Sequence, residues 1–379
     1  MDIVYTPAKT GYQHWMEQEG IPIVEGLAIE DVTDLPLKPW KRLGGNGTYI
    51  QLKGGGGVTG MYVVEIPAGG ALNPERHIYD KVIYILKGRG GTEVWQEGEK
   101  KQSFEWGEGS IFAPPLNTWH RLVNGAREPA VALVITTAPM MLDFFRDPNF
   151  VFNNDYQFKS RYQGEEDYFK GSGKRYKAIK TRMWDTNFIS DARNVMLDDA
   201  TYKTTKGQTT CFEMADNCLI GHIAEWPAGI YHNAHYHAAG AILLALHSTG
   251  YLLMWPKDLG VHPYQSGRED KVVEFHWKPG SIFSPPDGWF HQHFNTGPES
   301  ARHAAFRLGS RKNPTLFHDA TSGDREGVTT SIRDGGTVIA YDDEDPRIRK
   351  DFAETLKKNG VVSQMPPVTY RTDPLFTSN

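Results

Sequence analysis

The distribution of apolar residues along the chain predicts short β-strands. Short apolar runs recur at residues 63–66, 82–86, 131–136 and 242–246, and turns rich in glycine and proline separate them. Runs of this length bounded by such turns are typical of strands. We therefore expect a mainly all-β protein, built as antiparallel barrels or double-sheet jelly rolls.

One pattern of residues occurs twice in the chain. Gly69 and His77 lie 160 positions before Gly229 and His237. A second set lies 171 positions before its copy, namely Gly109, His120 and Asn124 before Gly280, His291 and Asn295. The additional residues of the second copy fall in a loop near 256–267. An internal repeat of this size predicts two similar barrels in tandem.

The repeat divides the chain into five parts. These are an N-terminal arm (1–48), a first barrel (49–138), a connector (139–205), a second barrel (206–310) and a C-terminal extension (311–379). The arm contains several prolines and tryptophans, so we expect it to pack across a neighbouring domain or subunit, and we expect a homo-oligomer. The connector is too aromatic for a disordered linker, and we expect it to wrap the barrels, with a short helix at 189–197.

The extension carries the clearest helix signal. Asp345 and the proline after it are typical of a helix start. Ile348, Phe352 and Leu356 then form one apolar stripe, and Gly360 fits the end. We predict a packing helix here, followed by an extended tail over 364–379.

Composition and charge narrow the class of protein. Lys and Arg total 41 against 46 Asp and Glu, a net charge of −5, which provides no basic surface for nucleic acid or an anionic membrane. Cys211 and Cys218 are too few for a disulfide framework. Residues 1–10 lack a signal pattern, and no apolar run reaches membrane-spanning length, so we expect a soluble cytoplasmic protein. The glycine run 54–57 has no Lys-Ser/Thr after it and predicts a flexible turn rather than a phosphate loop.

Two short segments of the second barrel carry the candidate chemistry. The first has the spacing G-x5-H-x-H and ends with His235 and His237; the second, G-x5-P-x-G-x2-H-x3-N, contains His291. Strand residues two apart share a face, so His235 and His237 should project together. His291 follows a Pro-Gly turn that reverses the chain. Three converging imidazoles suit Fe, Ni, Cu or Zn, whereas the alternative is three unrelated histidines on the surface.

These two motifs resemble the paired signature of the cupin superfamily, small β-barrels with a central metal. Cupins usually carry a glutamate ligand a few residues after the second histidine, but Ala241 stands there in this chain. The chain thus resembles the three-histidine iron dioxygenases, and, as a bicupin, the gentisate, salicylate and 1-hydroxy-2-naphthoate dioxygenase group. That group usually has its working metal in the N-terminal barrel, not the C-terminal one.

The resemblance implies a ring-cleaving Fe(II) dioxygenase acting on a hydroxylated aromatic acid or a related enolisable molecule with O2. One divalent metal per chain is expected, Fe(II) first, with Mn, Ni, Zn and Cu as alternatives. A second hypothesis is another metal-dependent cupin enzyme, an isomerase, hydrolase or lyase using Zn, Mn or Ni. A third is a non-enzymatic small-molecule-binding bicupin, which the complete histidine set argues against. Oxygen consumption separates the first two.

The first barrel has lost this histidine pattern. Glu75 replaces the first histidine, Lys81 stands where the glutamate is expected, and His77 and His120 remain. Glu75, His77 and His120 match a two-His-one-carboxylate metal site. The alternative is a buried Glu75–Lys81 ion pair, which we favour because a lysine repels a cation and buried charges require partners.

Three residues near the histidines are catalytic candidates. His293 should share a face with His291 and contact substrate, unless it lies at the barrel mouth bonded to backbone. His303 and Arg307 share a face of the closing strand. If that face points inward, Arg307 can bind a carboxylate through two hydrogen bonds; a surface salt bridge is the alternative. We expect His232 to lie at the surface. For Trp226, Trp289 and Phe290 two alternatives remain, an aromatic substrate pocket or ordinary packing in the core.

Overall fold

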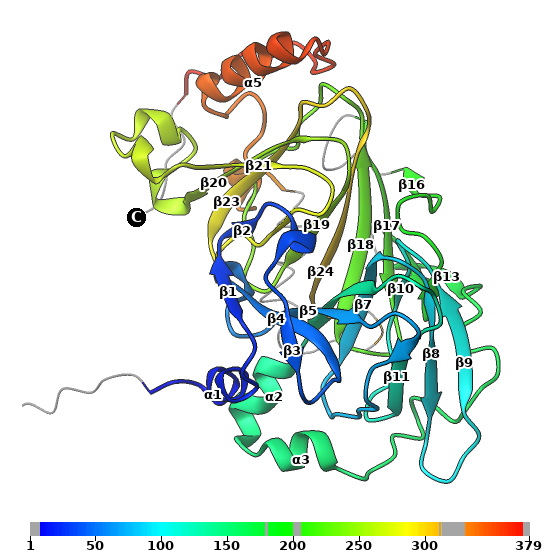
Figure 1. The fold of residues 1–379 in the computed structure, drawn as a ribbon. Coiled ribbons are helices and arrows are strands. Elements are labelled where there is room, and N and C mark those ends of the chain that lie inside the picture. The colour runs from blue at the N-terminus through cyan, green and yellow to red at the C-terminus, as the bar shows by residue number, and fades with distance from the viewer. Residues whose placement is uncertain (1–7, 179–180, 200–205, 311, 313–329, 374–379) are drawn as a thin grey trace, which may run out of the picture.

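The computed structural model describes residues 8–178, 181–199, 206–310, 312 and 330–373. Two β-barrels lie one above the other, the first drawn in blue and cyan and the second in green and yellow (Figure 1). This is the mainly β, two-barrel architecture predicted from the sequence. The parts of the arm, connector, extension and tail predictions that concern the remaining residues fall outside the described ranges.

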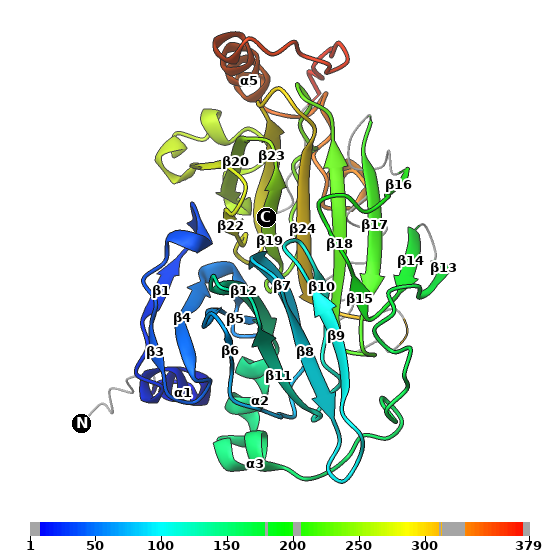
Figure 2. The ribbon, with the colours of Figure 1, turned by 45° about the vertical axis from the view of Figure 1, so that its right-hand side comes forward.

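Each barrel consists of a large and a small sheet (Figure 2). The large sheet of the first barrel has the order β1-β4-β5-β12-β7-β10-β15, with β3 beside β4. Its strands are β1 Ile23–Gly26, β3 Lys38–Trp40, β4 Gly45–Leu52, β5 Gly60–Ile66, β7 Lys81–Lys87, β10 Ile111–Phe112, β12 Ala130–Thr136 and β15 Phe188–Ile189. The small sheet has the order β6-β11-β8-β9, with strands β6 Gly70–Ala71, β8 Gly90–Trp95, β9 Gln102–Trp106 and β11 Trp119–Asn124.

The second barrel repeats this plan. Its large sheet has the order β13-β14-β17-β18-β24-β19-β22-β2, with β16 beside β17, and its small sheet the order β21-β20-β23. The large-sheet strands are β2 Ala28–Ile29, β13 Lys174–Ala178, β14 Thr181–Asp185, β16 Asp198–Asp199, β17 Gln208–Glu213, β18 Leu219–Trp226, β19 Ile242–His247, β22 Ile282–Phe283 and β24 Ala301–Leu308. The small-sheet strands are β20 Gly250–Pro256, β21 Val273–Trp277 and β23 Trp289–Asn295.

The barrels exchange edge strands. β2 of the arm pairs with β22 of the second barrel, and β15 of the connector pairs with β10 of the first. Beside these strands, the amide of Val32 donates to the Gly280 carbonyl (3.0 Å). The amide of Ala192 donates to the Gly109 carbonyl (2.8 Å). The arm therefore packs across a neighbouring domain, as predicted.

The two large sheets face each other and share one apolar core. Leu133 and Val63 of the first barrel belong to the same buried cluster as Ile223 and Phe306 of the second. Strands such as β12 and β19 are consequently buried on both faces. This double burial explains why the sequence there reads as a continuous apolar run instead of an alternating one.

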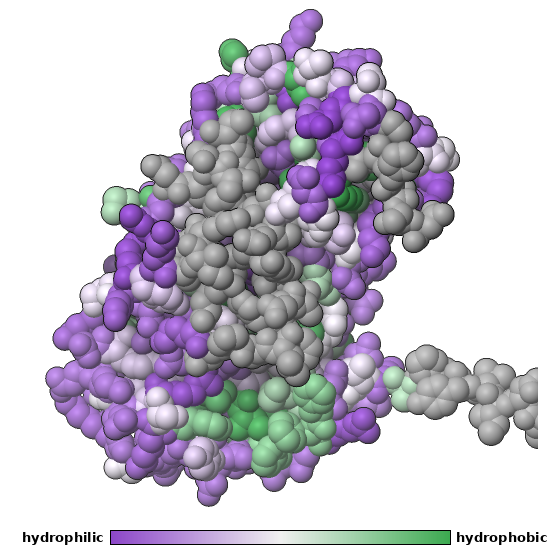
Figure 3. All heavy atoms as spheres, turned by 180° about the vertical axis from the view of Figure 1, so that it is seen from behind, coloured by the Kyte–Doolittle hydropathy of each residue, from purple (hydrophilic) through white to green (hydrophobic). Residues whose placement is uncertain are grey.

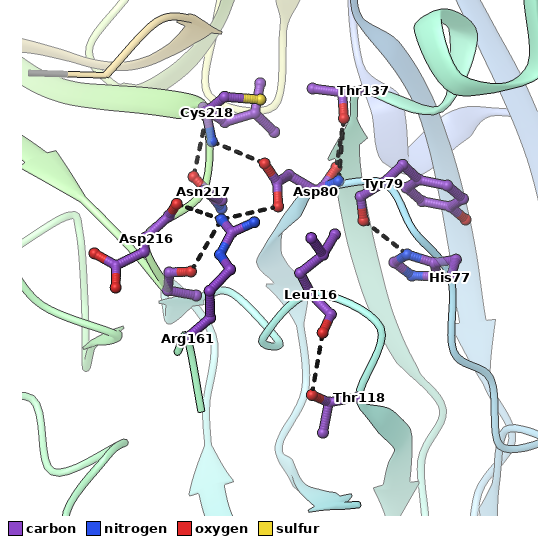
Figure 4. Close-up of polar contacts among 12 residues, drawn as sticks. His77, Tyr79, Asp80, Leu116, Thr118, Thr137, Arg161, Asp216, Asn217 and Cys218 are labelled. Carbon is purple, nitrogen blue, oxygen red and sulfur yellow. Dashed lines mark hydrogen bonds and ion pairs between the residues drawn. The ribbon is translucent and has the colours of Figure 1, made fainter. Parts of the chain in front are cut away.

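A polar contact also joins the barrels (Figure 4). The Asp80 carboxylate, just before β7, accepts from the Cys218 amide (2.9 Å) and from the Arg161 guanidinium of the connector (3.3 Å). The same guanidinium donates to the carbonyl of Asp216. Arg161 thus ties the first barrel to the turn that precedes β18.

In the described part of the chain, four α-helices lie around the barrels: α1 Gly11–Gln18, α2 Ala138–Phe145, α3 Pro148–Asn153 and α5 Pro346–Asn359. The predicted helix of the extension is confirmed as α5, at the top of Figure 1. Asp345 caps it by accepting from the Arg347 amide, and Gly360 ends it at φ 67°. Its stripe of Ile348, Phe352 and Leu356 is buried, as predicted.

Two local predictions need correction. Residues 189–197 do not form a helix, because the Asp191 carboxylate accepts from the Arg193 amide (2.9 Å) and holds a turn after β15. The glycine run 54–57 is a turn as predicted, but Gly54 is buried in the contact between the barrels. Its carbonyl accepts from the Gly240 amide at 2.6 Å, and a Cβ on Gly54 would lie 2.2 Å from the Ser284 carbonyl oxygen.

Three exposed phenylalanines of α2 and α3 form an apolar area on the surface. Phe144, Phe145 and Phe150 are 68%, 48% and 41% exposed. Figure 3 shows a hydrophobic area low on the molecule, in the part that carries α2 and α3 in Figure 1. Within the described ranges, no helix is long and apolar enough to cross a membrane.

Candidate metal centre

The loop between β18 and β19 places two of the three candidate ligands. It runs extended beside β23, and His235 exchanges both backbone hydrogen bonds with His291 (3.2 and 2.9 Å). Two residues on, the His237 carbonyl accepts from the amide of Gly288 in the Pro-Gly turn (3.3 Å). These isolated bridges, rather than a regular strand, bring the two sequence motifs together.

The side chains of His235, His237 and His291, here called the histidine triad, converge. Their candidate ligand atoms all lie within 4.8 Å of one another. The His291 ring lies 4.4 Å from that of His235 and 4.7 Å from that of His237 between centroids. The sequence spacing therefore predicted a real cluster of imidazoles.

Backbone carbonyls orient all three rings. Nδ1 of His235 lies 3.1 Å from the Asn233 oxygen, that of His237 2.8 Å from the Ala238 oxygen, and that of His291 3.3 Å from the Trp289 oxygen. A carbonyl oxygen can only accept a hydrogen bond, so in a neutral ring Nδ1 carries the hydrogen and Nε2 keeps its lone pair. Three neutral imidazoles held in this tautomer fit a divalent ion, which they would hold through Nε2.

No carboxylate joins the triad. Among the described residues, the group within ligand distance consists of the three histidines. Ala241 is buried, and it belongs to the same apolar cluster as Leu243 and Ala245 inside the barrel. A bound ion would therefore keep its full positive charge, with a small apolar side chain where a fourth ligand is usual.

His293 and His303 lie inside the second barrel, near the triad. They are 4% and 3% exposed, and Nδ1 of His293 and Nε2 of His303 lack a hydrogen-bond partner among the described residues. Burial, followed by the nearby imidazoles of His232 and His291, holds the pKa of His293 well below its usual range. Burial lowers the pKa of His303 to about 3. Both imidazoles are thus neutral at physiological pH.

Other predicted site residues are placed differently. The prediction that His232 lies at the surface is wrong: it is 6% exposed, because its amide donates to the His293 carbonyl (3.0 Å) and draws the loop inward. Trp226 belongs to the same apolar cluster inside the barrel as Ala241, and Trp289 packs against that cluster. Phe290 points to the opposite face of β23, where it packs on Trp255 (5.5 Å between centroids).

Arg307 lies near one end of β24. Its backbone pairs with Ile220 of β18, and its side chain is partly exposed. By strand periodicity it shares a face with His303 and with Ala305, which belongs to the apolar cluster inside the barrel. Arg307 thus lies on the same face of β24 as His303, closer to the end of the strand.

The first barrel contains a charge cluster at the equivalent position. Nζ of Lys81 lies 2.5 Å from Oε1 of Glu75, which confirms the predicted ion pair. Arg42 of the arm adds a second cation, 2.7 Å from Oε2. Burial alone would raise the pKa of Glu75, but Lys81, His120 and Arg42 hold that pKa well below its usual range. Sequence spacing gave no signal for Arg42.

Glu75, His77 and His120 nevertheless lie close enough together for a metal. Their candidate ligand atoms are within 4.8 Å of one another, and Nε2 of His120 is 3.7 Å from Oε1 of Glu75. Nδ1 of His77 lies 2.8 Å from the Tyr79 carbonyl oxygen (Figure 4). The Lys81 ammonium is, however, within contact distance of the same carboxylate, and it would repel a cation there.

The C-terminal extension braces the histidine loop. Val338 pairs with His235, and the amide of Ile339 donates to the Ala234 carbonyl (2.8 Å). Nearby, the buried Glu344 carboxylate accepts from the Tyr231 hydroxyl and from Nε2 of Gln292 (3.1 Å). Burial raises the pKa of Glu344 to about 7. In the sequence, the only indication of the Glu344 contacts is the run of four acidic residues at 342–345.

Comparisons with known proteins find a family match in the first barrel and similar solved structures. Residues 62–136, in the first barrel, match the cupin domain family. No protein with a curated description matches the sequence. Among solved structures, oxalate decarboxylase of Bacillus subtilis at pH 4.6 is similar, with 10% identity, a TM-score of 0.48, and coverage of 75% of this chain and 76% of that one. A variant of that enzyme has 11% identity, a TM-score of 0.47 and coverage of 75% and 78%. The first barrel thus matches the cupin domain family, and the second barrel is built on the same plan of one large and one small sheet.

Proposed function

We propose that the protein is a metal-dependent enzyme, an Fe(II) dioxygenase that cleaves a hydroxylated aromatic acid or a related enolisable small molecule. The observation that carries the proposal is the convergence of His235, His237 and His291, each with Nδ1 directed at a backbone carbonyl. Neutral imidazoles are ligands for Fe, Ni, Cu and Zn alike, so the chemistry must come from the rest of the site.

The apolar neighbour at 241 supports oxygenase chemistry. A bound Fe(II) would supply open coordination positions for two adjacent substrate oxygens and for O2, side by side. The chain would hold the three ligands rigidly and exclude water with the surrounding apolar side chains. The small side chain of Ala241 would leave space open beside the ligands. In this proposal His293 contacts the substrate and Arg307, near the rim, binds its carboxylate.

The alternative is a Lewis-acid enzyme, an isomerase, hydrolase or lyase, that uses Zn, Mn or Ni on the same three imidazoles. It makes no use of O2, so oxygen consumption separates the two candidates. We also propose a homo-oligomer, for which the exposed phenylalanines of α2 and α3 offer an apolar contact surface.

The test has two stages. Elemental analysis of anaerobically purified protein identifies the metal, and oxygen uptake is then measured with gentisate, salicylate and 1-hydroxy-2-naphthoate. We expect one Fe per chain and substrate-dependent uptake that the variant His235→Ala lacks. Stoichiometric Zn or Ni, together with no uptake on any phenolic acid, would favour the Lewis-acid alternative.

A further inference from the structure

Five buried side chains form a compact group inside the second barrel, here called the inner cluster: Trp226, Trp277, Phe283, His293 and His303. They come from five strands of both sheets, namely β18, β21, β22, β23 and β24. The His303 ring lies 4.6 Å from Trp277, 4.8 Å from Trp226 and 5.4 Å from Phe283 between centroids. The inner cluster is therefore a single contact group in the barrel interior.

The inner cluster adjoins the histidine triad. The ring of His293 lies 5.7 Å from that of His291 on one side and 5.7 Å from that of His303 on the other. On β23, His291 and His293 are two residues apart and pair with Met254 and Leu252 of β20, so they share one face of the strand. A small molecule held at the triad and extending along β23 would thus meet the inner cluster.

The inner cluster contains an unusual number of unsatisfied polar atoms. Nε1 of Trp226, Nε1 of Trp277, Nδ1 of His293 and Nε2 of His303 are all buried without a hydrogen-bond partner among the described residues. Leaving such a group without a partner is costly, and native proteins contain few of them. Four in one contact group indicate a partner that is not part of the protein chain.

The chemistry of these atoms defines that partner. An indole N–H only donates, so two of the four atoms require an acceptor. The inner cluster has no lysine, arginine or carboxylate, so its side chains provide no permanent charge to pair with an anion. A carboxylate placed there would lose its hydration without gaining a counter-charge, which is costly. The fitting partner is an uncharged oxygen acceptor.

We infer that the inner cluster is a substrate subsite for an uncharged oxygen, a carbonyl or hydroxyl group, on the part of the substrate farthest from the chelating oxygens. This inference rests on the proposed function for the role of the triad. It adds an orientation: any carboxylate stays toward the rim of the barrel, where Arg307 lies, and an uncharged oxygen-bearing end points inward.

The test uses the full chain after metal removal, so that binding is measured independently of turnover. Calorimetric titration compares three probes of similar size: acetophenone (neutral carbonyl), benzoate (anion) and ethylbenzene (no oxygen). We expect acetophenone to bind at least about tenfold more tightly than either of the others, the effect of one hydrogen bond. Equal binding of acetophenone and ethylbenzene, tighter binding of benzoate, or no binding of acetophenone would each overturn the subsite.

A matched pair of variants locates the binding. Trp277→Phe removes one unpartnered indole N–H and should weaken acetophenone about tenfold while leaving ethylbenzene unchanged. Trp255→Phe is the control, because Trp255 is equally buried but donates to the Gly260 carbonyl (3.0 Å) in another cluster. Unchanged acetophenone binding in a folded Trp277→Phe protein would contradict the inference, and Trp226→Phe serves if that variant does not fold. Binding without oxygen uptake would leave the subsite standing and refute only the dioxygenase.

Discussion

Nζ of Lys81 lies 2.5 Å from Oε1 of Glu75, at the place in the first barrel that corresponds to Ala241 and His235 in the second. The two barrels therefore stabilise their interiors differently. The first encloses the carboxylate of Glu75 between the cations of Lys81 and Arg42, whereas the second contains neutral imidazoles.

Removal of the Lys81 charge should destabilise the first barrel. In Lys81→Met the buried Glu75 retains only Arg42 as a close cation, and we expect a loss of roughly 3 kcal/mol in the free energy of unfolding. Urea denaturation measures it. The control is Lys101→Met, which breaks an exposed pair with Glu93 and should change stability little. Equal losses in both variants would contradict a special role for the buried pair.

Metal content should depend on the second barrel alone. His235→Ala should reduce bound metal to near zero, because two imidazoles hold a divalent ion far less firmly than three. His77→Ala should leave it nearly unchanged, since Lys81 already neutralises that site. Elemental analysis of both variants decides the matter. Two metals per chain in the unaltered protein would refute the ion-pair account of the first barrel.

A glutamate at position 241 should separate metal binding from oxygen chemistry. Ala241 belongs to the apolar cluster inside the barrel, so the new carboxylate would lie in the barrel interior that also holds the triad. It would add a ligand and a negative charge and occupy space that substrate or O2 requires. We expect Ala241→Glu to retain metal and lose most substrate-dependent oxygen uptake, with Ala241→Gly close to the unaltered protein. Near-normal uptake in Ala241→Glu would argue for the Lewis-acid alternative.

Arg307 provides a test of substrate charge. If Arg307 binds the carboxylate, Arg307→Leu should raise KM for an acid at least about tenfold, since charge-assisted hydrogen bonds contribute about 1.5–3 kcal/mol. KM for the corresponding amide should change little. Steady-state kinetics with the acid and amide of one substrate measure the difference. A similar change for both would exclude Arg307 from the site.

Glu344 should make stability fall as pH rises. Its pKa is raised from 4.5 to about 7 in the folded protein, so folding binds a proton between these values. The resulting stabilisation is complete below about pH 4.5 and is lost as pH rises toward 7. Glu344→Gln removes this titration, so the melting temperature of the variant relative to the unaltered protein should increase from pH 5 to pH 8. A pH-independent difference would show that Glu344 does not titrate in this range.

The sequence predicted those features that depend on local spacing. The strands of the large sheets produce long apolar runs because both faces are buried, and the histidine triad follows from two turns of fixed geometry. The two-residue strands β2 and β15 have no periodicity, so their exchange between barrels was not predictable. Arg42 and Glu344 reach their partners through long-range contacts. His232 was misplaced because the inward course of a loop depends on backbone bonds to a distant strand.

The bracing of His235 by Val338 has a consequence for the order of events during synthesis. The first barrel requires only β15, which follows it closely in the chain, to complete its large sheet. The loop that carries His235 and His237 leaves the ribosome well before Val338 and Ile339, which lie near the end of the chain. The second barrel therefore reaches its final form only after residues 338 and 339 have been synthesised, and a nascent chain arrested before residue 338 would display both motif histidines without their support.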